Sequence, residues 1–381
     1  MPDQLNRREL ARRLDAVTDH AIRNKRVLGT VLMVAIDGET VYRRAAGLAD
    51  RETNTPMSED AIFRLSSVTK PLTSAAIMVL VERGVIALDH HVTRYLPEFR
   101  PRLANGTAPD ITLRHLLTHT SGLSYRFLDV AGGHYDQADI SDGLDQPNLS
   151  LDENLRRLAS VPLRFAPGEQ WNYSLGLDVL GAVIERVTGE SFPNAMHRLV
   201  TSPLGLDDLT FHVDRSRRLV KPYIDGHPDP VAMTEESIVP AYANAIRYAP
   251  SRIHYKDSYP SGGCGMAGTA GDILQFLEVI RKGGAPILQR STVEDMMRDH
   301  VGPQAGTQGP GWGFGYGWAV LSDAAASDSP QSPGTLQWGG VYGHNWFIDP
   351  LKRLTVVSLT NTTFEGMSGA YPNRIRDALY V

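Results

Sequence analysis

The chain has 381 residues, a formal net charge of −5 at pH 7, and 42% hydrophobic and 21% charged residues. Such a composition is typical of a folded protein with a large core, excludes disorder and fibrous repeats, and at this length favours two lobes. Basic residues gather only in short clusters such as Arg7-Arg8 and Arg12-Arg13, so we expect no nucleic-acid partner. The single cysteine, Cys264, excludes a disulfide within the chain, and we interpret it as a small buried residue.

The two ends of the chain are rich in strand-forming residues. The chain opens with an amphipathic helix over residues 4–26, followed by a hairpin whose turn is Asp37-Gly38, and it closes with a helix over 374–380. The predicted strands span residues 30–36, 39–43, 315–322, 336–348 and 354–360. We therefore predict an α+β fold in which both ends of the chain build one antiparallel sheet flanked by helices.

The middle of the chain has a helical pattern instead. The segments with apolar residues at helical spacing are 71–84, 151–160 and 174–188. We predict a mostly helical lobe over residues 71–210, inserted into a sheet lobe formed by residues 1–70 and 211–381, with an active site at their interface. The Gly- and Asp-rich segment 127–150 is expected to be a long loop over that site, and 322–335 a second flexible connection.

The first residues of the chain lack the apolar segment of a signal peptide. No apolar run approaches the length of a membrane span. On these grounds we expect a cytoplasmic protein that makes no membrane contact.

Ser67-Val68-Thr69-Lys70 is the first candidate for chemistry. Because residues three apart share a helix face, Ser67 and Lys70 can meet at the start of the helix that follows. There the helix dipole favours developing negative charge, and a lysine one turn later can accept the serine proton or stabilise its base. A bare Ser-x-x-Lys occurs often by chance, but this one opens a strongly periodic helix at the junction of the predicted lobes.

Two further segments carry candidate groups. Tyr173 follows a Pro-Gly turn at the start of a predicted helix, and a phenol beside a lysine can have its pKa lowered and act as a base. Alone, a packing role for this tyrosine is the better interpretation. Gly339-Gly340 lies within a predicted strand, which indicates close approach of backbone or ligand, or a bulge beside a turn.

Together these motifs resemble the serine β-lactamase and penicillin-binding-protein superfamily. Leu116-Leu-Thr-His-Thr-Ser-Gly-Leu123 and Pro260-Ser-Gly-Gly263 extend the resemblance over most of the chain. Within the superfamily, the sequence is most similar to the family VIII carboxylesterases. The resemblance implies a β-lactamase/DD-peptidase-like fold and a serine acyl-enzyme, with no metal and no cofactor.

The resemblance also assigns residues. Ser67 matches the nucleophile, Lys70 its partner lysine, and Tyr173 the tyrosine that shares a proton with Ser67, here expected as a phenolate. The backbone N–H groups of Ser67 and Val341 would form the oxyanion hole. The residues that the resemblance places at or near the substrate are Tyr125, Trp338, Gly339, Gly340, His344 and Trp346.

Two departures from the superfamily pattern bear on the substrate. Leu175 stands where penicillin-recognising enzymes have an asparagine, and Trp338 stands where they have a lysine that meets the substrate carboxylate. Replacing a cation by an indole removes an attraction for anions and adds an apolar wall. We therefore predict a carboxylesterase that hydrolyses short-chain esters of small molecules. The alternatives are a β-lactamase or DD-peptidase, an acyltransferase using the same acyl-enzyme, and a non-enzymatic binding protein.

Several motifs imitate functional ones. Lys282-Gly283-Gly284 looks like a Lys-Thr-Gly motif but follows a helical run, so we interpret it as a helix C-terminus. Tyr242-Ala243-Asn244 fits the Tyr-x-Asn pattern but lacks the turn and helix start found at Tyr173. His115 and His119 have the spacing of a zinc helix without its glutamate, so a structural role is expected.

Overall fold

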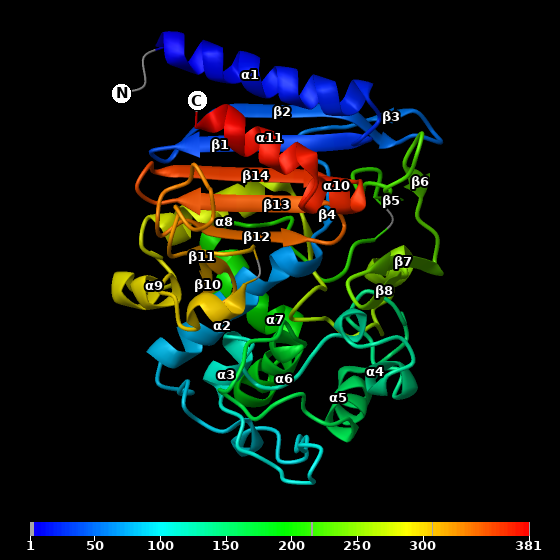
Figure 1. Cartoon of the computed structure of the whole chain (residues 1–381), viewed down its shortest axis with the longest axis vertical. Coiled ribbons are helices and arrows are strands. Elements are labelled where there is room, and N and C mark those ends of the chain that lie inside the picture. Colours follow the sequence, from blue (N-terminus) through cyan, green and yellow to red (C-terminus); the bar gives the residue numbers. More distant parts are fainter. Residues whose placement is uncertain (1–3, 215, 307, 381) are drawn as a thin grey trace.

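Strands from both ends of the chain form one antiparallel sheet. The computed structural model describes residues 4–214, 216–306 and 308–380, and in them the sheet has eight strands in the order β10-β11-β12-β13-β14-β1-β2-β3 (Figure 1). Its strands are β1 Gly29–Ile36, β2 Glu39–Asp50, β3 Thr55–Pro56, β10 Trp312–Phe314, β11 Ala319–Leu321, β12 Leu336–Gly340, β13 His344–Asp349 and β14 Leu354–Thr360. The predicted α+β class and the sheet built from both ends are confirmed. Residues 1–3, 215, 307 and 381 of the predicted sheet lobe lie outside the described residues.

Strand β1 lies in the middle of this sheet and divides two cores. Alternate side chains of a strand point to opposite faces. Leu32 and Val34 therefore pack with the terminal helices on one face, whereas Val31 and Met33 join the main core on the other. Helices α1 and α11 cover the first face in Figure 1, and α8 packs on β1 and β14 from the second. The bounds are α1 Gln4–Arg23, α8 Ala270–Arg281, α10 Thr363–Met367 and α11 Ala370–Leu379.

The remaining helices gather at the other end of the molecule, mostly in the part of Figure 1 farthest from α1. They are α2 Thr69–Glu82, α3 Leu113–Leu117, α4 His134–Gln137, α5 Leu151–Ser160, α6 Gly176–Thr188, α7 Phe192–Met196 and α9 Arg290–Met296. Helix α2 is buried on every side over residues 69–80, including its polar residues Lys70, Thr73 and Ser74. The division of the chain into two lobes stays a prediction.

Some predicted strands differ in extent from the observed ones. The predicted strand 336–348 is interrupted by a turn at 341–343, where Gly343 has a φ of 115° that only glycine adopts easily. The predicted strand 315–322 falls across β10, a turn and β11. Both segments contain more than one glycine, which is compatible with a strand as well as with a turn, so the pattern alone does not place the break.

Short paired strands outside the main sheet complete the fold. They are β4 Phe63–Arg64 with β9 Ala267–Gly268, β5 Tyr223–Ile224 with β6 Val231–Ala232, and β7 Ser237–Ala241 with β8 Asn244–Tyr248. The predicted loop 127–150 holds only the end of a 3-10 turn and α4, and 322–335 holds neither helix nor strand. Within the described ranges, no helix combines the length and the apolar character needed to cross a bilayer.

Candidate active site

A strained turn presents Ser67 at the junction of sheet and helices. Strand β4 leads into a 3-10 turn, Ser66–Val68, which runs directly into α2. Ser66 has a φ of 43°, a left-handed conformation that costs a non-glycine residue free energy and that occurs mostly at functional turns. The Ser66 hydroxyl accepts a bond from the backbone N–H of Tyr342 at 3.4 Å, which helps to hold the turn.

Lys70 approaches Ser67 from one helical turn further on. Its Nζ donates to Ser67 Oγ at 3.1 Å and to the carbonyl oxygen of Gly263 at 2.9 Å, and it lies 4.6 Å from the centre of the Tyr173 ring. Burial acts to lower the pKa of Lys70, but the surrounding Cys264, Tyr173 and Asp178 outweigh burial and raise that pKa. Of these three groups only the Asp178 carboxylate is ionised near pH 7, since the thiol and the phenol keep their protons. The resting side chain is therefore an ammonium group.

Tyr173 approaches the same serine from the segment before α6. Its hydroxyl lies 2.7 Å from Ser67 Oγ and accepts a weaker bond from the indole Nε1 of Trp338 at 3.4 Å. Burial raises the pKa of Tyr173, and the nearby Lys70 charge only partly opposes it. The resting group is thus a phenol, in contrast to the phenolate expected from the sequence. A base arises only when the Lys70–Tyr173 pair loses one shared proton.

The end of strand β12 packs against the turn that carries Ser67. Gly340 packs against the nucleophile turn so closely that a Cβ there would lie 2.5 Å from both the Leu65 carbonyl oxygen and Ser66 Oγ. The predicted close approach at the paired glycines is therefore present. Ser67 and Val341, whose N–H groups are the expected oxyanion donors, both line the cavity described next.

Ser67 lies in a cavity of about 590 Å³ between strands β12 and β13 and the surrounding loops. None of the described residues that line it is charged, and the lining combines aromatic or aliphatic groups with carboxamides. The lining residues are Ser67, Phe127, Leu128, Trp171, Asn172, Tyr173, Tyr242, Gln308, Gln337, Trp338, Gly339, Val341, Asn345, Met367, Ser368, Pro372 and Asn373.

His344 and Trp346 are not among these lining residues. Both are buried, and the Nε2 of His344 bonds to the carbonyl oxygen of Arg64 at 2.8 Å. Burial lowers the pKa of His344 to about 4, so the ring is neutral at pH 7. Trp346 pairs with Trp338 across the sheet and faces the same side as that lining residue, but it is fully buried against the Trp318 ring at 6.3 Å. The contribution of His344 and Trp346 is to packing beneath the site.

Tyr125 and Leu175 also lie beneath the cavity surface. Both are fully buried, and the Tyr125 ring packs 4.9 Å from the Tyr173 ring and 5.2 Å from Lys70 Nζ. Tyr125 thus supports the two groups that contact Ser67. Leu175 is part of the core, so its side chain does not meet a ligand in the cavity.

The sequence missed three residues near the site. Tyr242, set aside as part of a false Tyr-x-Asn motif, lies between β7 and β8 and lines the cavity with its ring 5.3 Å from that of Phe127. Phe127 begins the loop that was expected over the site. Asp178 is a carboxylate within the buried face of α6, and its place in the apolar run Gly176-Leu-Asp-Val-Leu180 was the available signal.

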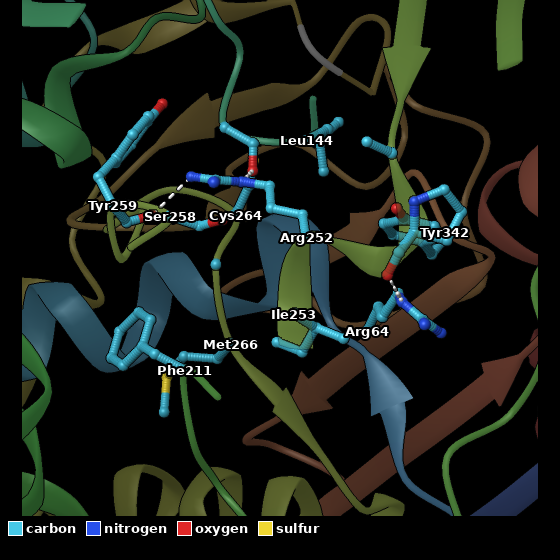
Figure 2. Close-up of a pocket in the computed structure, with 14 residues that line it drawn as sticks. Arg64, Leu144, Phe211, Arg252, Ile253, Ser258, Tyr259, Cys264, Met266 and Tyr342 are labelled. Atoms are coloured by element: carbon cyan, nitrogen blue, oxygen red, sulfur yellow. Dashed lines mark hydrogen bonds between the residues drawn. The ribbon is translucent and has the colours of Figure 1, made fainter. Parts of the chain in front are cut away.

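A second, smaller pocket is lined by residues that include Cys264, Arg64 and Arg252 (Figure 2). The Sγ of Cys264 is 3.8 Å from Ser67 Oγ. Burial raises the pKa of Cys264, which keeps the thiol neutral and agrees with its interpretation as a small buried residue. The Arg252 guanidinium donates to the Tyr259 carbonyl oxygen at 2.6 Å.

The imitating motifs have structural roles. His115 caps α3 by bonding the backbone N–H of Thr112, and His119 bonds Ser174 Oγ at 3.0 Å. In the part of the chain that the structure describes, no three His, Cys, Asp or Glu side chains group as metal ligands would. Helix α8 ends at Arg281, and Gly283 follows it with a φ of 100°.

Comparisons with known proteins agree with this geometry. The family model described as Beta-lactamase matches residues 12–380. The chain is 54% identical over 379 residues to "Esterase EstB" of Burkholderia gladioli, which covers 99% of this chain and 96% of that protein. The structure of "EstCE1, a hydrolase with promiscuous acyltransferase activity" superposes with a TM-score of 0.97 at 46% identity, over 99% of this chain and 100% of that one.

A more distant structure shares the fold alone. The penicillin-binding protein homologue from Pyrococcus abyssi has a TM-score of 0.73 at 22% identity, over 95% of this chain and 75% of that one. The predicted β-lactamase/DD-peptidase-like fold is therefore confirmed. With a family model that matches nearly its whole length, the chain belongs to the beta-lactamase family.

Proposed function

We propose that the protein is a carboxylesterase that hydrolyses short-chain esters of small molecules through an acyl-enzyme on Ser67. The observation that carries this proposal is the convergence of Lys70 and Tyr173 on Ser67 Oγ, at 3.1 and 2.7 Å, inside an uncharged cavity. The similarity to an esterase and to a hydrolase supports the reaction class.

The proposed reaction follows from the protonation of the site. Loss of one proton from the Lys70–Tyr173 pair leaves Tyr173 able to take the Ser67 proton as Oγ attacks the ester carbonyl. The tetrahedral oxyanion accepts hydrogen bonds from the N–H groups of Ser67 and Val341. Tyr173 then returns the proton to the leaving alcohol, and a water molecule activated in the same way releases the acid.

The lining of the cavity favours neutral esters over β-lactams and peptides with a free carboxylate. Trp338 presents an indole at the wall, and no cation is found among the described lining residues. An anionic substrate would lose its hydration without gaining a partner charge. A neutral acyl group instead buries apolar surface against rings such as Phe127 and Trp171.

Acyl transfer to an added alcohol is a second candidate function. At about 590 Å³ the cavity has room for an acceptor beside a short acyl group, and its aromatic lining retains apolar acceptors. The solved hydrolase EstCE1 is described as having promiscuous acyltransferase activity. The ratio of new ester to free acid, measured with an added alcohol, separates this function from plain hydrolysis.

The first test compares hydrolysis of p-nitrophenyl butyrate by the wild type, Ser67→Ala and Ser74→Ala. Ser74 is a buried serine of the same helix and serves as the matched control. We expect fast wild-type turnover, a loss of at least about a thousandfold in Ser67→Ala, and near-normal turnover in Ser74→Ala. An inert wild type, or a fully active Ser67→Ala, would overturn the proposal.

A further inference from the structure

Helix α6 holds a buried carboxylate that the mechanism above does not use. Asp178 is 1% exposed, and neither of its oxygens makes a hydrogen bond of regular geometry among the described residues, although the Ser261 hydroxyl and the Gly263 backbone N–H approach the carboxylate and act against the rise in its pKa that burial causes. A buried carboxylate without regular hydrogen bonds costs considerable free energy unless an opposite charge compensates it. We therefore looked for an opposite charge near Asp178 and for a role that its carboxylate could have in the site.

The compensating group is Lys70. The carboxylate, the Tyr125 hydroxyl and the Lys70 ammonium converge on one small space beside Gly263. A Cβ on Gly263 would lie 2.8 Å from Asp178 Oδ2, 2.9 Å from the Tyr125 hydroxyl and 3.3 Å from Lys70 Nζ. The glycine leaves this space open, and any larger residue would separate the three groups.

Lys70 therefore lies between two acidic groups of different kinds. On one side Nζ donates to Ser67 Oγ, which is also bonded to Tyr173. On the other side the Asp178 carboxylate lies across the space beside Gly263, beyond direct ion-pair contact but close enough for its charge to act on Lys70. The carboxylate adds to the influences that raise the pKa of Lys70.

Other groups face Asp178 from the elements packed around α6. The titratable and charged ones are Lys70 of α2, Tyr125 after α3, Arg252 and Tyr259 before β9, and Cys264. Arg252 is the second cation, but its guanidinium donates to the carbonyl oxygens of Gly143 and Tyr259 at 3.0 and 2.6 Å (Figure 2). Lys70 is the cation that shares the small space with the carboxylate.

We propose that Asp178 is a positioning residue whose carboxylate holds Lys70 as an ammonium, so that the proton lost from the Lys70–Tyr173 pair leaves Tyr173. This inference rests on the proposed roles of Ser67, Lys70 and Tyr173. The deprotonated pair has two forms, charged lysine with phenolate or neutral lysine with phenol. An anion beside Lys70 favours the first form, in which the phenolate is the base that takes the Ser67 proton.

The same charge has a second, measurable effect. The protonated pair carries one more positive charge than the deprotonated pair, so a neighbouring anion stabilises the protonated form and raises the apparent pKa of the pair. Removing the anion must therefore move the rising limb of the pH–rate profile to lower pH. A carboxylate that only filled space in α6 would have no such effect.

The experiment measures how fast a p-nitrophenyl alkylphosphonate reacts with Ser67 between pH 5 and 10, in the wild type, Asp178→Asn and Asp178→Glu. Phosphonylation needs the nucleophile and its base but no ester turnover. Asp349→Asn is the matched control, since Asp349 is buried too but contacts Ser332, Lys352 and Tyr380 instead. If Asp178→Asn does not fold, Asp178→Ser removes the same charge.

In Asp178→Asn we expect the rising limb to move to lower pH by about one pH unit or more and the plateau rate to fall about tenfold. Asp178→Glu should restore the wild-type position of the limb, and Asp349→Asn should keep it. The loss caused by Tyr173→Phe should also shrink in the Asp178→Asn background, because neutral Lys70 then serves as the base. A folded, charge-free variant with the wild-type profile would overturn the proposal.

The outcomes also separate this inference from the proposed function. A wild type that is phosphonylated but hydrolyses no ester contradicts the esterase proposal and leaves the profile of Asp178→Asn as the test of Asp178. A wild type that is not phosphonylated at any pH overturns the role of Ser67 and that of Asp178 with it.

Discussion

The Tyr173 hydroxyl lies 2.7 Å from the Oγ of Ser67, although 106 positions separate the two residues in the chain. Helices α2 and α6 pack directly on each other, and Tyr173 lies shortly before the first residue of α6, Gly176. The packing of these two helices, which extends well beyond the site, therefore sets the position of the proposed base. This packing keeps the Tyr173 hydroxyl and Ser67 Oγ at the short distance that proton transfer requires.

Removing the Tyr173 hydroxyl should abolish most of the activity. Tyr173→Phe keeps the ring and its packing but leaves the Ser67 proton without an acceptor, so kcat should fall by about a hundredfold to ten thousandfold with KM little changed. Tyr242→Phe is the matched control, because Tyr242 lines the same cavity without contacting Ser67. Steady-state kinetics on p-nitrophenyl butyrate make the comparison, and a nearly normal Tyr173→Phe enzyme contradicts the assigned role.

Activity should rise with pH above neutrality. The pKa of Lys70 and the pKa of Tyr173 are both raised, so the pair holds both protons at pH 7. The reactive form has lost one proton, and its fraction grows about tenfold with each pH unit until the apparent pKa of the pair is reached. Plots of kcat/KM from pH 6 to 10 test this, corrected for spontaneous ester hydrolysis. An optimum below pH 6 would count against the assignment.

Charge at the cavity wall should control which esters react. Trp338→Lys places a cation where the structure has an indole, so the ratio of kcat/KM for an ester with an acyl carboxylate to that for butyrate should rise about tenfold or more. Trp338→Phe removes the indole N–H that bonds Tyr173 but adds no charge, and should leave the ratio unchanged. If Trp338→Lys and Trp338→Phe change this ratio of kcat/KM values equally, charge at the cavity wall does not control which esters react.

The buried Asp178 should make the protein less stable at high pH. Burial raises its folded-state pKa to about 6, against about 3.9 in an unfolded chain. The folded state therefore binds this proton more tightly, so the contribution of Asp178 is most favourable below pH 4 and is lost as pH rises through 6. Measured against the wild type, the unfolding free energy of Asp178→Asn should therefore be about 2 kcal/mol higher at pH 8 than at pH 4.

Urea unfolding of the wild type and Asp178→Asn at pH 4 and pH 8 measures this difference. Asp349→Asn, which removes another buried carboxylate, is the control. If wild type and Asp178→Asn differ in unfolding free energy by the same amount at both pH values, ionisation of Asp178 does not destabilise the folded protein.

The sequence predicted those parts of the site that depend on local geometry. The spacing of Ser67 and Lys70 needs only a helix, and the alternation of Val31 to Val34 needs only a two-faced strand. His344 and Trp346 were expected near the substrate, yet neither lines the cavity, whereas Trp338, the cross-strand partner of Trp346, does. Which of two side chains on one face of a sheet reaches a cavity depends on the elements packed around it, and the sequence of one strand does not set that.

The rest of the site depends on contacts between distant segments. Tyr242 and Phe127 come from different loops, and only the packing of these loops brings their rings 5.3 Å apart. Asp178 stands out in the sequence as a charge among apolar residues, but its partner becomes visible only where Gly263 leaves space beside Lys70. Residues of this kind cannot be grouped from spacing within one segment.

The most direct test of the central claim is to trap the acyl-enzyme. Wild type and Ser67→Ala are mixed with excess p-nitrophenyl butyrate, quenched in acid within milliseconds, digested and analysed by mass spectrometry. We predict a butyryl group on the wild-type peptide that contains Ser67, formed and lost at rates that match turnover, and none on the Ser67→Ala peptide. Butyrylation of another residue, or turnover with no butyryl group on Ser67, would contradict the account.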